Sequence, residues 1–276
     1  MSQESSEPTA ELRGVDLDYR SGPPWARLHK RAVSGVSLGV APRETLGLVG
    51  QSGSGKTSVG RLMLGLLRPT NGTVLFEGRL IGEERRRHRG RLQAVLQNPA
   101  WSLDPRMRCG ISIAEPLTVA RTLTPAMTRA MTRAERRRRV GEILEHVGLD
   151  PGVAARYPHE LSGGQQQRVA IARALISEPA LVVFDEAVSA LDVSVQAQIL
   201  NLIKRLQAEV GFAALFISHD IAAARYVSQR VAVMHKTEIV EIADSGDLYH
   251  SASHPYTRSL FELGSGAAER ATKAGG

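Results

Sequence analysis

The stretch Gly50-Gln51-Ser52-Gly53-Ser54-Gly55-Lys56-Thr57 is the most informative part of this 276-residue sequence. It matches GxxxxGK[ST], in which glycines let the backbone curl so that its N–H groups point at phosphate oxygens. A predicted strand, Thr45–Gly50, precedes it. A predicted helix, Ser58–Leu67, follows with Val59, Leu62, Met63 and Leu66 on one face, and it presents its positive N-terminus to the same anion. Lys56 can reach the β- and γ-phosphates, and the Thr57 hydroxyl can ligate Mg2+. The stretch therefore predicts a phosphate-binding loop, or P-loop, for a nucleotide with Mg2+.

Composition and charge exclude several other classes. Hydrophobic residues make up 42% of the chain, which is enough for a sizeable core, and no apolar stretch is long enough to cross a bilayer. The acidic N-terminus, MSQESSEPTAE, is unlike a secretory signal. A single cysteine, Cys109, cannot form an internal disulfide or a zinc site, which fits a reducing compartment. The net charge of +7 indicates an anionic partner: nucleic acid, lipid headgroups or nucleotide.

The order of predicted elements indicates an α/β fold. Short apolar runs between turn residues predict strands in the first fifty residues, whereas the middle of the chain is helical in pattern and rich in arginine. The run Arg136–Arg139 is interpreted as a solvated helix face, and a lipid-facing or partner-facing role is the alternative. The remaining runs predict the strands Thr73–Glu77, Ala180–Phe184 and Phe212–Ile217, a terminal strand pair Val231–Met234 and Glu238–Ile242, and a helix from Val195 to Val210 that stops at Gly211. The order of strands and helices argues for a parallel α/β sheet with a helical insertion.

Two carboxylates follow one of the buried strands. Asp185 and Glu186 end the apolar run Leu181–Phe184, and open α/β sheets bind ligands at the carboxyl ends of their strands. Asp185 is placed to hold Mg2+, directly or through water, and Glu186 is placed to orient and polarise the attacking water. An acid pair at a helix N-terminus is the alternative, which the P-loop upstream disfavours.

The segment Leu161-Ser162-Gly163-Gly164-Gln165 lies about twenty residues before Asp185. Together with the P-loop it resembles the ATPases of ABC transporters, and the resemblance extends from about residue 11 to 262. It implies a P-loop NTPase (RecA-like) core with an antiparallel β subdomain and an inserted α-helical subdomain. It also implies a division into a flexible tail (1–10), an ATPase domain (11–250) with the helical subdomain (101–178), and a C-terminal extension (251–276).

The resemblance implies a role for each matching residue. Glu186, His219, Gln97 and Lys56 would be catalytic, with His219 on the γ-phosphate and Gln97 on Mg2+ and the attacking water. Thr57, Gln97 and Asp185 would hold Mg2+. ATP would be bound by Tyr19, which resembles the aromatic residue that stacks on adenine, and by Gly50, Gln51, Ser52, Gly53, Ser54, Gly55, Lys56, Thr57, Ser58, Ser162, Gly163, Gly164, Gln165 and Asp192. Plainer alternatives are a strand tyrosine, a surface glutamine and a structural histidine.

Further segments resemble the ATPases of dipeptide, oligopeptide and nickel importers. They are Pro99–Met107, Ala114–Leu117, His159–Leu175 and His254–Leu260, the last reading HPYTRSL. This implies a head-to-tail dimer, in which a related second ATPase is favoured as the partner over a second copy of this chain. Ser162, Gly163 and Gly164 of the partner's equivalent surface would complete the site. It also implies two membrane permease subunits, an extracytoplasmic solute-binding protein, and a location at the cytoplasmic face of the membrane, with no nucleic-acid partner. Because Cys109 is far from the C-terminus, the chain resembles the subunit without an iron–sulfur cluster.

Three departures from the family pattern leave every phosphate and magnesium contact in place. Ala187 stands where proline is usual, Arg43 stands where glycine is common, and His235-Lys236-Thr237 stands where a glycine turn is frequent. A DNA-repair ATPase of the same family is a rival, but such chains usually carry long coiled coils or zinc modules. A subunit that binds ATP without hydrolysing it is a second rival. The cargo, whether peptide, nickel or another small solute, depends on other subunits.

Overall fold

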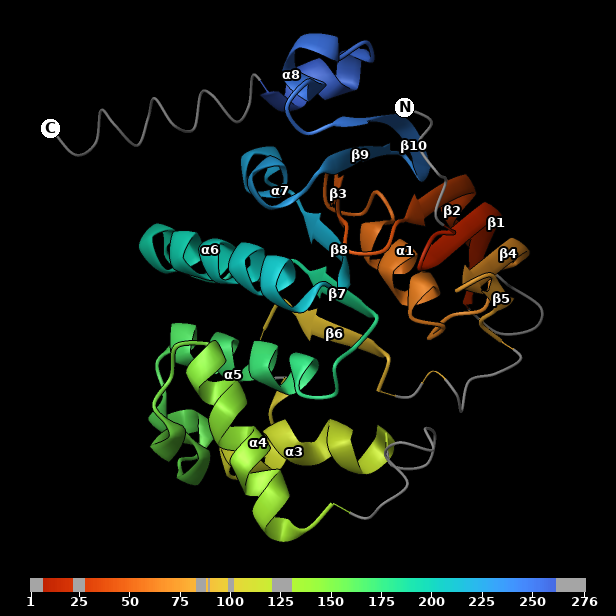
Figure 1. Ribbon diagram of the computed structural model, residues 1–276. Helices are drawn as coiled ribbons and strands as arrows, with labels where there is room; N and C mark the ends of the chain where they lie inside the picture. The colour runs from red at the N-terminus through yellow and green to blue at the C-terminus, as the bar shows by residue number, and fades with distance from the viewer. Residues whose placement is uncertain are drawn as a thin grey trace, which may run out of the picture. The chain divides into compact units, whose positions relative to one another are not determined.

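The computed structural model describes residues 7–21, 28–82, 88, 90–98, 102–120 and 131–261 (Figure 1). The chain forms two units: unit 1 contains residues 1–80 and 215–276, and unit 2 contains residues 81–214. Among the described helices, none is long and apolar enough to cross a bilayer. The segments 1–6 and 99–101, which belong to the predicted tail and to the predicted importer-like segment, lie outside the described residues.

Unit 1 contains an antiparallel sheet with strand order β2-β1-β4-β5. Its strands are β1 (Ala10–Ser21), β2 (Leu28–Val40), β4 (Asn71–Phe76) and β5 (Arg79–Leu80). Successive side chains of a strand point to opposite faces, and one face of these strands is apolar and buried. The residues buried on β1 and β2 include Leu12, Val15, Leu17, Val33, Val36 and Leu38. The predicted antiparallel β subdomain is confirmed.

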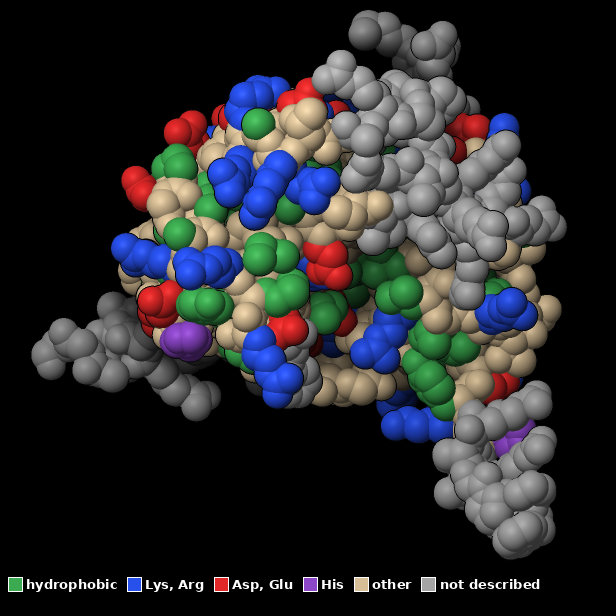
Figure 2. Space-filling model, turned by 90° about the horizontal axis from the view of Figure 1, so that it is seen from below, with side chains coloured by type: hydrophobic (Ala, Val, Ile, Leu, Met, Phe, Trp, Pro, Cys, Tyr) green, Lys and Arg blue, Asp and Glu red, His purple; other side chains and the backbone are tan. Residues whose placement is uncertain are grey.

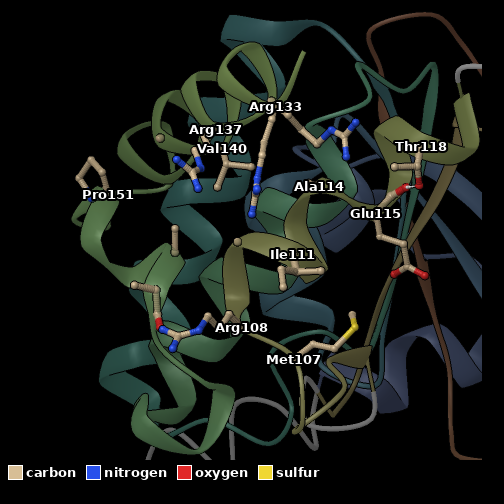
Figure 3. Close-up of a pocket in the computed structure, with 15 residues that line it drawn as sticks. Met107, Arg108, Ile111, Ala114, Glu115, Thr118, Arg133, Arg137, Val140 and Pro151 are labelled. Carbon is tan, nitrogen blue, oxygen red and sulfur yellow. Dashed lines mark hydrogen bonds between the residues drawn. The ribbon is translucent and has the colours of Figure 1, made fainter. Parts of the chain in front are cut away.

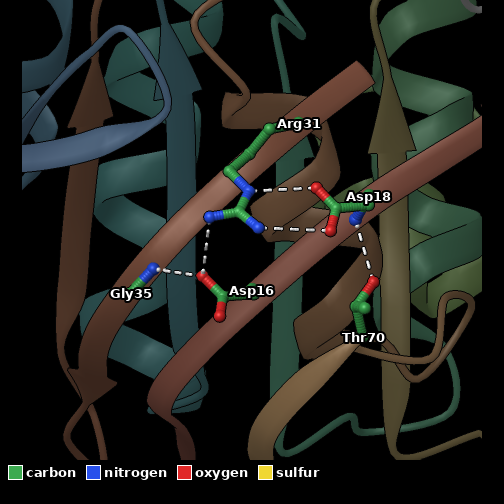
Figure 4. Close-up of polar contacts among 5 residues, drawn as sticks. All are labelled: Asp16, Asp18, Arg31, Gly35 and Thr70. Atoms are coloured by element: carbon green, nitrogen blue, oxygen red, sulfur yellow. Dashed lines mark hydrogen bonds and ion pairs between the residues drawn. The ribbon is translucent and has the colours of Figure 1, made fainter. Parts of the chain in front are cut away.

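An ion-pair cluster joins β1 to β2 beside the register shift between Leu17 and Asp18 (Figure 4). Arg31 faces Asp18, with Nε at 3.0 Å from Oδ1 and a second nitrogen at 3.3 Å from Oδ2. Asp16 accepts a hydrogen bond of 2.8 Å from the N–H of Gly35, and the N–H of Asp18 donates to the Thr70 hydroxyl at 2.9 Å. These contacts tie the middle of β1 to β2 and to the start of β4.

Unit 1 also contains the strand order β10-β9-β3-β8. The strands are β3 (Thr45–Val49), β9 (Arg230–His235), β10 (Glu238–Asp244) and β8 (Ala213–Ser218), of which the residues from Leu215 onward belong to this unit. β3 pairs in parallel with β9, and β9 pairs antiparallel with β10. Every residue of β3 and β8 is buried, which explains their continuous apolar sequences.

Unit 1 also contains the helices α1 (Lys56–Met63), α7 (Ile221–Val227) and α8 (Leu248–Ser251), and residues 255–261 are helical as well. The predicted face of α1 is largely confirmed, because Val59, Leu62 and Met63 are buried. Leu66 was expected on the same face, and that expectation is wrong. The helix ends at Met63, Gly65 adopts a positive φ of 65°, and Leu66 is 65% exposed.

Unit 2 contains the parallel pair β6 (Leu92–Leu96) and β7 (Leu181–Asp185) and the long helix α6 (Val193–Val210), which ends at Gly211 with φ of 80°. The rest is helical, as predicted: α3 (Cys109–Ala120), α4 (Arg133–His146), α5 (Gly163–Leu175), and the 3-10 turns η2 (Pro151–Ala155) and η3 (Pro158–Glu160). α3 packs against α5, α4 and η2, and the three α-helices lie together in Figure 1. The parallel pairing and the helical insertion are both confirmed.

The arginine run of α4 is only partly a solvated face. Arg137 and Arg138 are exposed, and Arg138 pairs with Glu142 one turn later. Arg136 and Arg139 are half-buried, and Arg139 pairs with Glu178 at 3.0 Å. Helical geometry places these two side chains on the packed side of α4. The run of like charges in the sequence does not indicate which of its members lie there.

Candidate nucleotide-binding site

The P-loop of unit 1 follows β3 and leads into α1, and two of its glycines are required by close backbone approaches. A side chain at Gly50 would place its Cβ 2.1 Å from the carbonyl oxygen of Met234, on β9. At Gly55, which has a φ of 111°, the Cβ would lie 2.2 Å from the carbonyl oxygen of Ala32, on β2. Thr237, in the β9–β10 turn, donates its N–H to the Ser54 carbonyl at 3.1 Å. The loop is thus packed between strands that are far from it in sequence.

Lys56 lies across the P-loop and is only 4% exposed. Its Nζ donates to the carbonyl oxygens of Gly50 and Gln51, both at 2.8 Å. The start of α1 suits an anion, because its N-cap, Gly55, supplies no side-chain hydrogen bond and its first turn contains no acidic residue. The buried hydroxyl of Ser54 has no hydrogen-bond partner within the described chain. This cradle therefore fits a nucleotide phosphate.

Two other predicted residues belong to the same unit. Tyr19, on β1, is 37% exposed, and its hydroxyl lies 3.2 Å from the hydroxyl of Ser58, the residue after the P-loop. Tyr19 therefore lies beside the P-loop, and its stacking on a base stays a prediction. His219 is exposed directly after β8, which neighbours β3 in the sheet, so it follows the strand next to the one that precedes the P-loop.

In unit 2, the parallel register of β6 and β7 brings three predicted residues to one strand end. Leu96 lies opposite Asp185, so Gln97 and Glu186 each follow their strand at the same level. Glu186 has a φ of 50°, in the left-handed region that non-glycine residues rarely adopt. Ser189 holds the turn by donating its N–H and its hydroxyl to the Glu186 carbonyl, at 3.1 and 2.9 Å. Strain of this kind is typical of functional sites.

The donor types in the predicted magnesium set are a hydroxyl, an amide and a carboxylate, from Thr57, Gln97 and Asp185. All three offer oxygen, which is what Mg2+ takes, usually together with substrate phosphates and water. The part of the chain that the structure describes contains no cluster of three His, Cys, Asp or Glu residues that could hold a metal by itself. The donor chemistry therefore fits Mg2+ that arrives with a nucleotide.

The LSGGQ segment begins α5 and is organised by its own contacts. Ser162 is the N-cap, and its hydroxyl accepts the Gln165 N–H at 3.3 Å while the Gln165 side chain accepts the Ser162 N–H at 3.0 Å. A side chain at Gly164 would place its Cβ 2.7 Å from Cγ1 of Val195, on α6. Asp192 caps α6 by accepting the Val195 N–H at 2.9 Å. The exposed surface left at this helix start is formed by Ser162 and Gly163.

A pocket of about 810 Å3 lies between α3, α4 and η2 in unit 2. Figure 3 shows Ile111 and Ala114 on its α3 side and Arg133 and Arg137 on its α4 side. Ile111, which lines the pocket, is 58% exposed. Figure 2, which views the face that carries α3 and α4, shows Lys and Arg side chains interspersed with hydrophobic ones. The pocket thus combines apolar walls with positive charge.

A sequence model of the ABC transporter family matches residues 33–189. The chain belongs to the ABC transporter family. It is 48% identical over 256 residues to a protein of Brucella abortus (strain 2308) provisionally named a peptide import ATP-binding protein, covering 91% of this chain and 74% of the relative. A similarly named protein of Brucella ovis is 44% identical over 257 residues, covering 92% of this chain and 77% of the relative.

Solved structures agree with this membership. The ATP-binding cassette MJ0796, seen as a dimer in a post-hydrolysis state bound to ADP and Pi, is 30% identical, with a TM-score of 0.72 over 86% of this chain and 98% of that one. The cbiO1 protein of Clostridium perfringens, part of the ABC transporter complex cbiONQ, has a TM-score of 0.75 at 22% identity over 90% of this chain and 92% of that one, which supports the fold alone. The P-loop NTPase fold and the ABC-type ATPase activity predicted from the sequence are confirmed.

Sequence reasoning located the motifs but missed the residues that support them. Ala32, Met234 and Thr237 contact the P-loop through backbone atoms, which no sequence pattern indicates. Tyr256 also contacts the loop, and its place in the HPYTRSL segment was a signal that could have found it. The individual roles of the predicted site residues stay predictions.

Proposed function

We propose that this ABC ATPase powers the import of dipeptides or oligopeptides through a pair of membrane permease subunits. The observation that carries the proposal is the 48% identity, over 91% of the chain, to a relative provisionally named a peptide import ATP-binding protein. The segments at Pro99–Met107 and His254–Leu260 support it. The protein would act at the cytoplasmic face of the membrane, and a solute-binding protein outside it would deliver the peptide.

The active unit is a head-to-tail dimer with a related second ATPase. This chain carries one P-loop and one LSGGQ segment, and Ser162 and Gly163 are exposed at the start of α5. Ser162 and Gln165 hydrogen-bond to one another, so the remaining N–H groups of the first turn of α5 can face an anion on another subunit. The partner's nucleotide is that anion, and the dimeric structure of MJ0796 supports this arrangement.

Hydrolysis rests on positioning and electrostatics more than on covalent chemistry. Lys56 exchanges its contacts with the loop carbonyls for phosphate oxygens and offsets the charge that develops on the transferred phosphoryl group. Glu186, held in its left-handed turn, orients the attacking water and accepts its proton, and His219 contacts the γ-phosphate. Mg2+, when bound to Thr57, Gln97 and Asp185, supplies further neutralisation of phosphate charge.

The role of Glu186 is tested by Glu186→Gln in the assembled transporter. The amide keeps the size of the side chain but cannot accept the water proton, so we expect nucleotide binding to persist while turnover falls by about two to four orders of magnitude. Glu209→Gln is the control, since Glu209 pairs with Arg205 on the exposed surface of α6. ATPase activity of Glu186→Gln equal to that of this control would refute the assignment.

The pocket between α3 and α4 is the permease contact in this proposal. Its apolar walls and its arginines fit a short permease helix with apolar and acidic side chains. Ile111→Glu should prevent assembly with the permeases and leave nucleotide binding by the free protein unchanged. Val210→Glu, at a 44% exposed position at the end of α6, is the matched control. Normal assembly of Ile111→Glu would place the contact elsewhere.

The cargo is tested by uptake in cells that lack this gene. We expect the deletion to remove uptake of labelled di- and oligopeptides, and the wild-type gene but not the Glu186→Gln gene to restore it. Loss of nickel uptake with peptide uptake intact would replace the peptide assignment with the alternative that the sequence left open.

A further inference from the structure

The C-terminal segment around HPYTRSL contacts the P-loop directly. The hydroxyl of Tyr256 accepts a hydrogen bond of 2.8 Å from the N–H of Gln51, although 205 residues separate them. The ring of Tyr256 also packs on the ring of His235, at the end of β9, with centroids 3.9 Å apart. Burial, together with nearby Lys236 and His254, lowers the pKa of His235.

The segment that carries Tyr256 is itself anchored on β10. The carboxylate of Glu241 accepts hydrogen bonds from the N–H and the hydroxyl of Ser253, at 2.7 and 3.1 Å, and from the N–H of His254 at 3.4 Å. The N–H of Tyr256 donates to Nδ1 of His254 at 3.2 Å, and the Ser259 hydroxyl donates to the Tyr256 carbonyl at 2.8 Å. Tyr256 is therefore held from both its ring and its backbone.

Gln51 lies in the exposed part of the P-loop, where Tyr256 holds its N–H. Gln51, Ser52 and Gly53 are exposed, and the Gln51 carbonyl is held by Lys56 Nζ at 2.8 Å and by the Ser54 N–H at 3.2 Å. When Lys56 turns to a phosphate, the Gln51 carbonyl loses its charged donor. The Tyr256 hydroxyl does not depend on the nucleotide, so it continues to fix Gln51 in the occupied loop.

We propose that Tyr256 is a positioning residue that braces the P-loop, so that the C-terminal HPYTRSL segment sets nucleotide affinity. The proposal rests on nucleotide binding at this P-loop, which belongs to the proposed function. The brace orders the loop before ATP arrives, which lowers the ordering cost of binding. Tyr256 does not touch the reacting atoms, so its loss weakens binding and leaves the chemical step intact.

The test compares Tyr256→Phe with wild type in the full-length protein. Phenylalanine keeps the ring on His235 and removes only the hydroxyl. The affinity of Tyr256→Phe for a fluorescent ATP analogue should therefore be about three- to tenfold weaker than that of the wild type. In the assembled ATPase, KM should rise by a similar factor while kcat stays within twofold. Amide hydrogen exchange should accelerate at residues 50–54 while the temperature of unfolding stays unchanged, which separates positioning from a general loss of stability.

Two reference variants make the outcome decisive. Tyr249→Phe alters another C-terminal tyrosine, 59% exposed, whose ring packs on Phe261, and should behave as wild type. Lys56→Ala should abolish nucleotide binding. If Lys56→Ala does so while Tyr256→Phe matches Tyr249→Phe in affinity and exchange, the brace is refuted and the nucleotide site stands. If the wild-type protein binds no nucleotide, the proposed function fails and the brace fails with it.

Discussion

The two glycines of the LSGGQ segment should respond in opposite ways to the same substitution. In Gly164→Ala the new Cβ would lie 2.7 Å from Cγ1 of Val195, about 0.7 Å inside an ordinary van der Waals contact. In Gly163→Ala the nearest side-chain atom is Cδ2 of Leu191 at 3.8 Å, which is ordinary contact. Fold packing therefore requires glycine at 164 and permits alanine at 163.

The magnitude follows from two opposing terms. Overpacking at a contact of this kind costs about 1–3 kcal/mol. Alanine in place of glycine in a helix stabilises the folded state by about 0.5–1 kcal/mol. Gly164→Ala should therefore lower the free energy of unfolding by about 1–2 kcal/mol, whereas Gly163→Ala should leave it equal or slightly higher. Equilibrium urea unfolding of the full-length protein measures both.

A double-mutant cycle identifies the contact responsible. Val195→Ala removes both Cγ atoms, so it should abolish most of the cost of Gly164→Ala and give a coupling of about 1 kcal/mol or more. The same cycle with Gly163→Ala should be additive. Gly163→Ala should nevertheless reduce ATPase activity at least tenfold, because its exposed surface faces the partner's nucleotide in the proposed dimer. Additive effects for Gly164→Ala with Val195→Ala, or an unchanged stability of Gly164→Ala, would refute the reasoning from close packing.

Three further outcomes are expected in unit 1. Arg230→Met removes the guanidinium that pairs with the 9% exposed Glu44 carboxylate at 2.7 Å. Urea unfolding should then show a free energy of unfolding lower by about 2 kcal/mol. An unchanged free energy would mean that the Ala41 N–H is a sufficient partner for the Glu44 carboxylate. Thr237 is β-branched and has a φ of 78°, so Thr237→Gly should relieve backbone strain while keeping both backbone hydrogen bonds of residue 237. The temperature of unfolding should rise by a few degrees, and a fall would contradict the inference of strain. Burial alone would raise the pKa of Glu241, but hydrogen bonds from the 253–257 segment outweigh burial and lower that pKa below its ordinary value of 4.5. The stability that Glu241 contributes is therefore present above pH 4.5 and lost as the pH falls through the lower folded-state pKa. Glu241→Gln should flatten this acid-induced loss of stability in a pH series of unfolding curves.

Local patterns predicted most of the elements because the relevant forces act over short stretches. The buried strands β3, β7 and β8 were visible as continuous apolar runs, and the end of α6 was visible as a glycine after an amphipathic stripe. Leu66 failed the same reasoning, because the chain leaves the helix three residues earlier through a positive φ at Gly65. The predicted solvated face was wrong for Arg136 and Arg139, because the packing of α4 and not the charge decides which side chains are half-buried.

The cysteine and the charge acquire a clearer meaning in the fold. Cys109 is fully buried at the start of α3, and burial raises the pKa of its thiol, so it behaves as an apolar core residue. Of the 35 basic side chains behind the net charge of +7, Lys56 alone lies across the P-loop in the described chain. Several arginines instead line the pocket between α3 and α4.

The family, the P-loop, the LSGGQ segment and the alternation of strands and helices follow from the sequence alone, because each is encoded in neighbouring residues whose chemistry and spacing act locally. Which distant residues support these motifs depends on the tertiary structure. The register of β6 on β7 sets Gln97 beside Glu186, the crossing of α5 and α6 requires Gly164, and the path of the C-terminal segment brings Tyr256 to Gln51. Such contacts depend on how separate elements pack and pair, so no local pattern contains them.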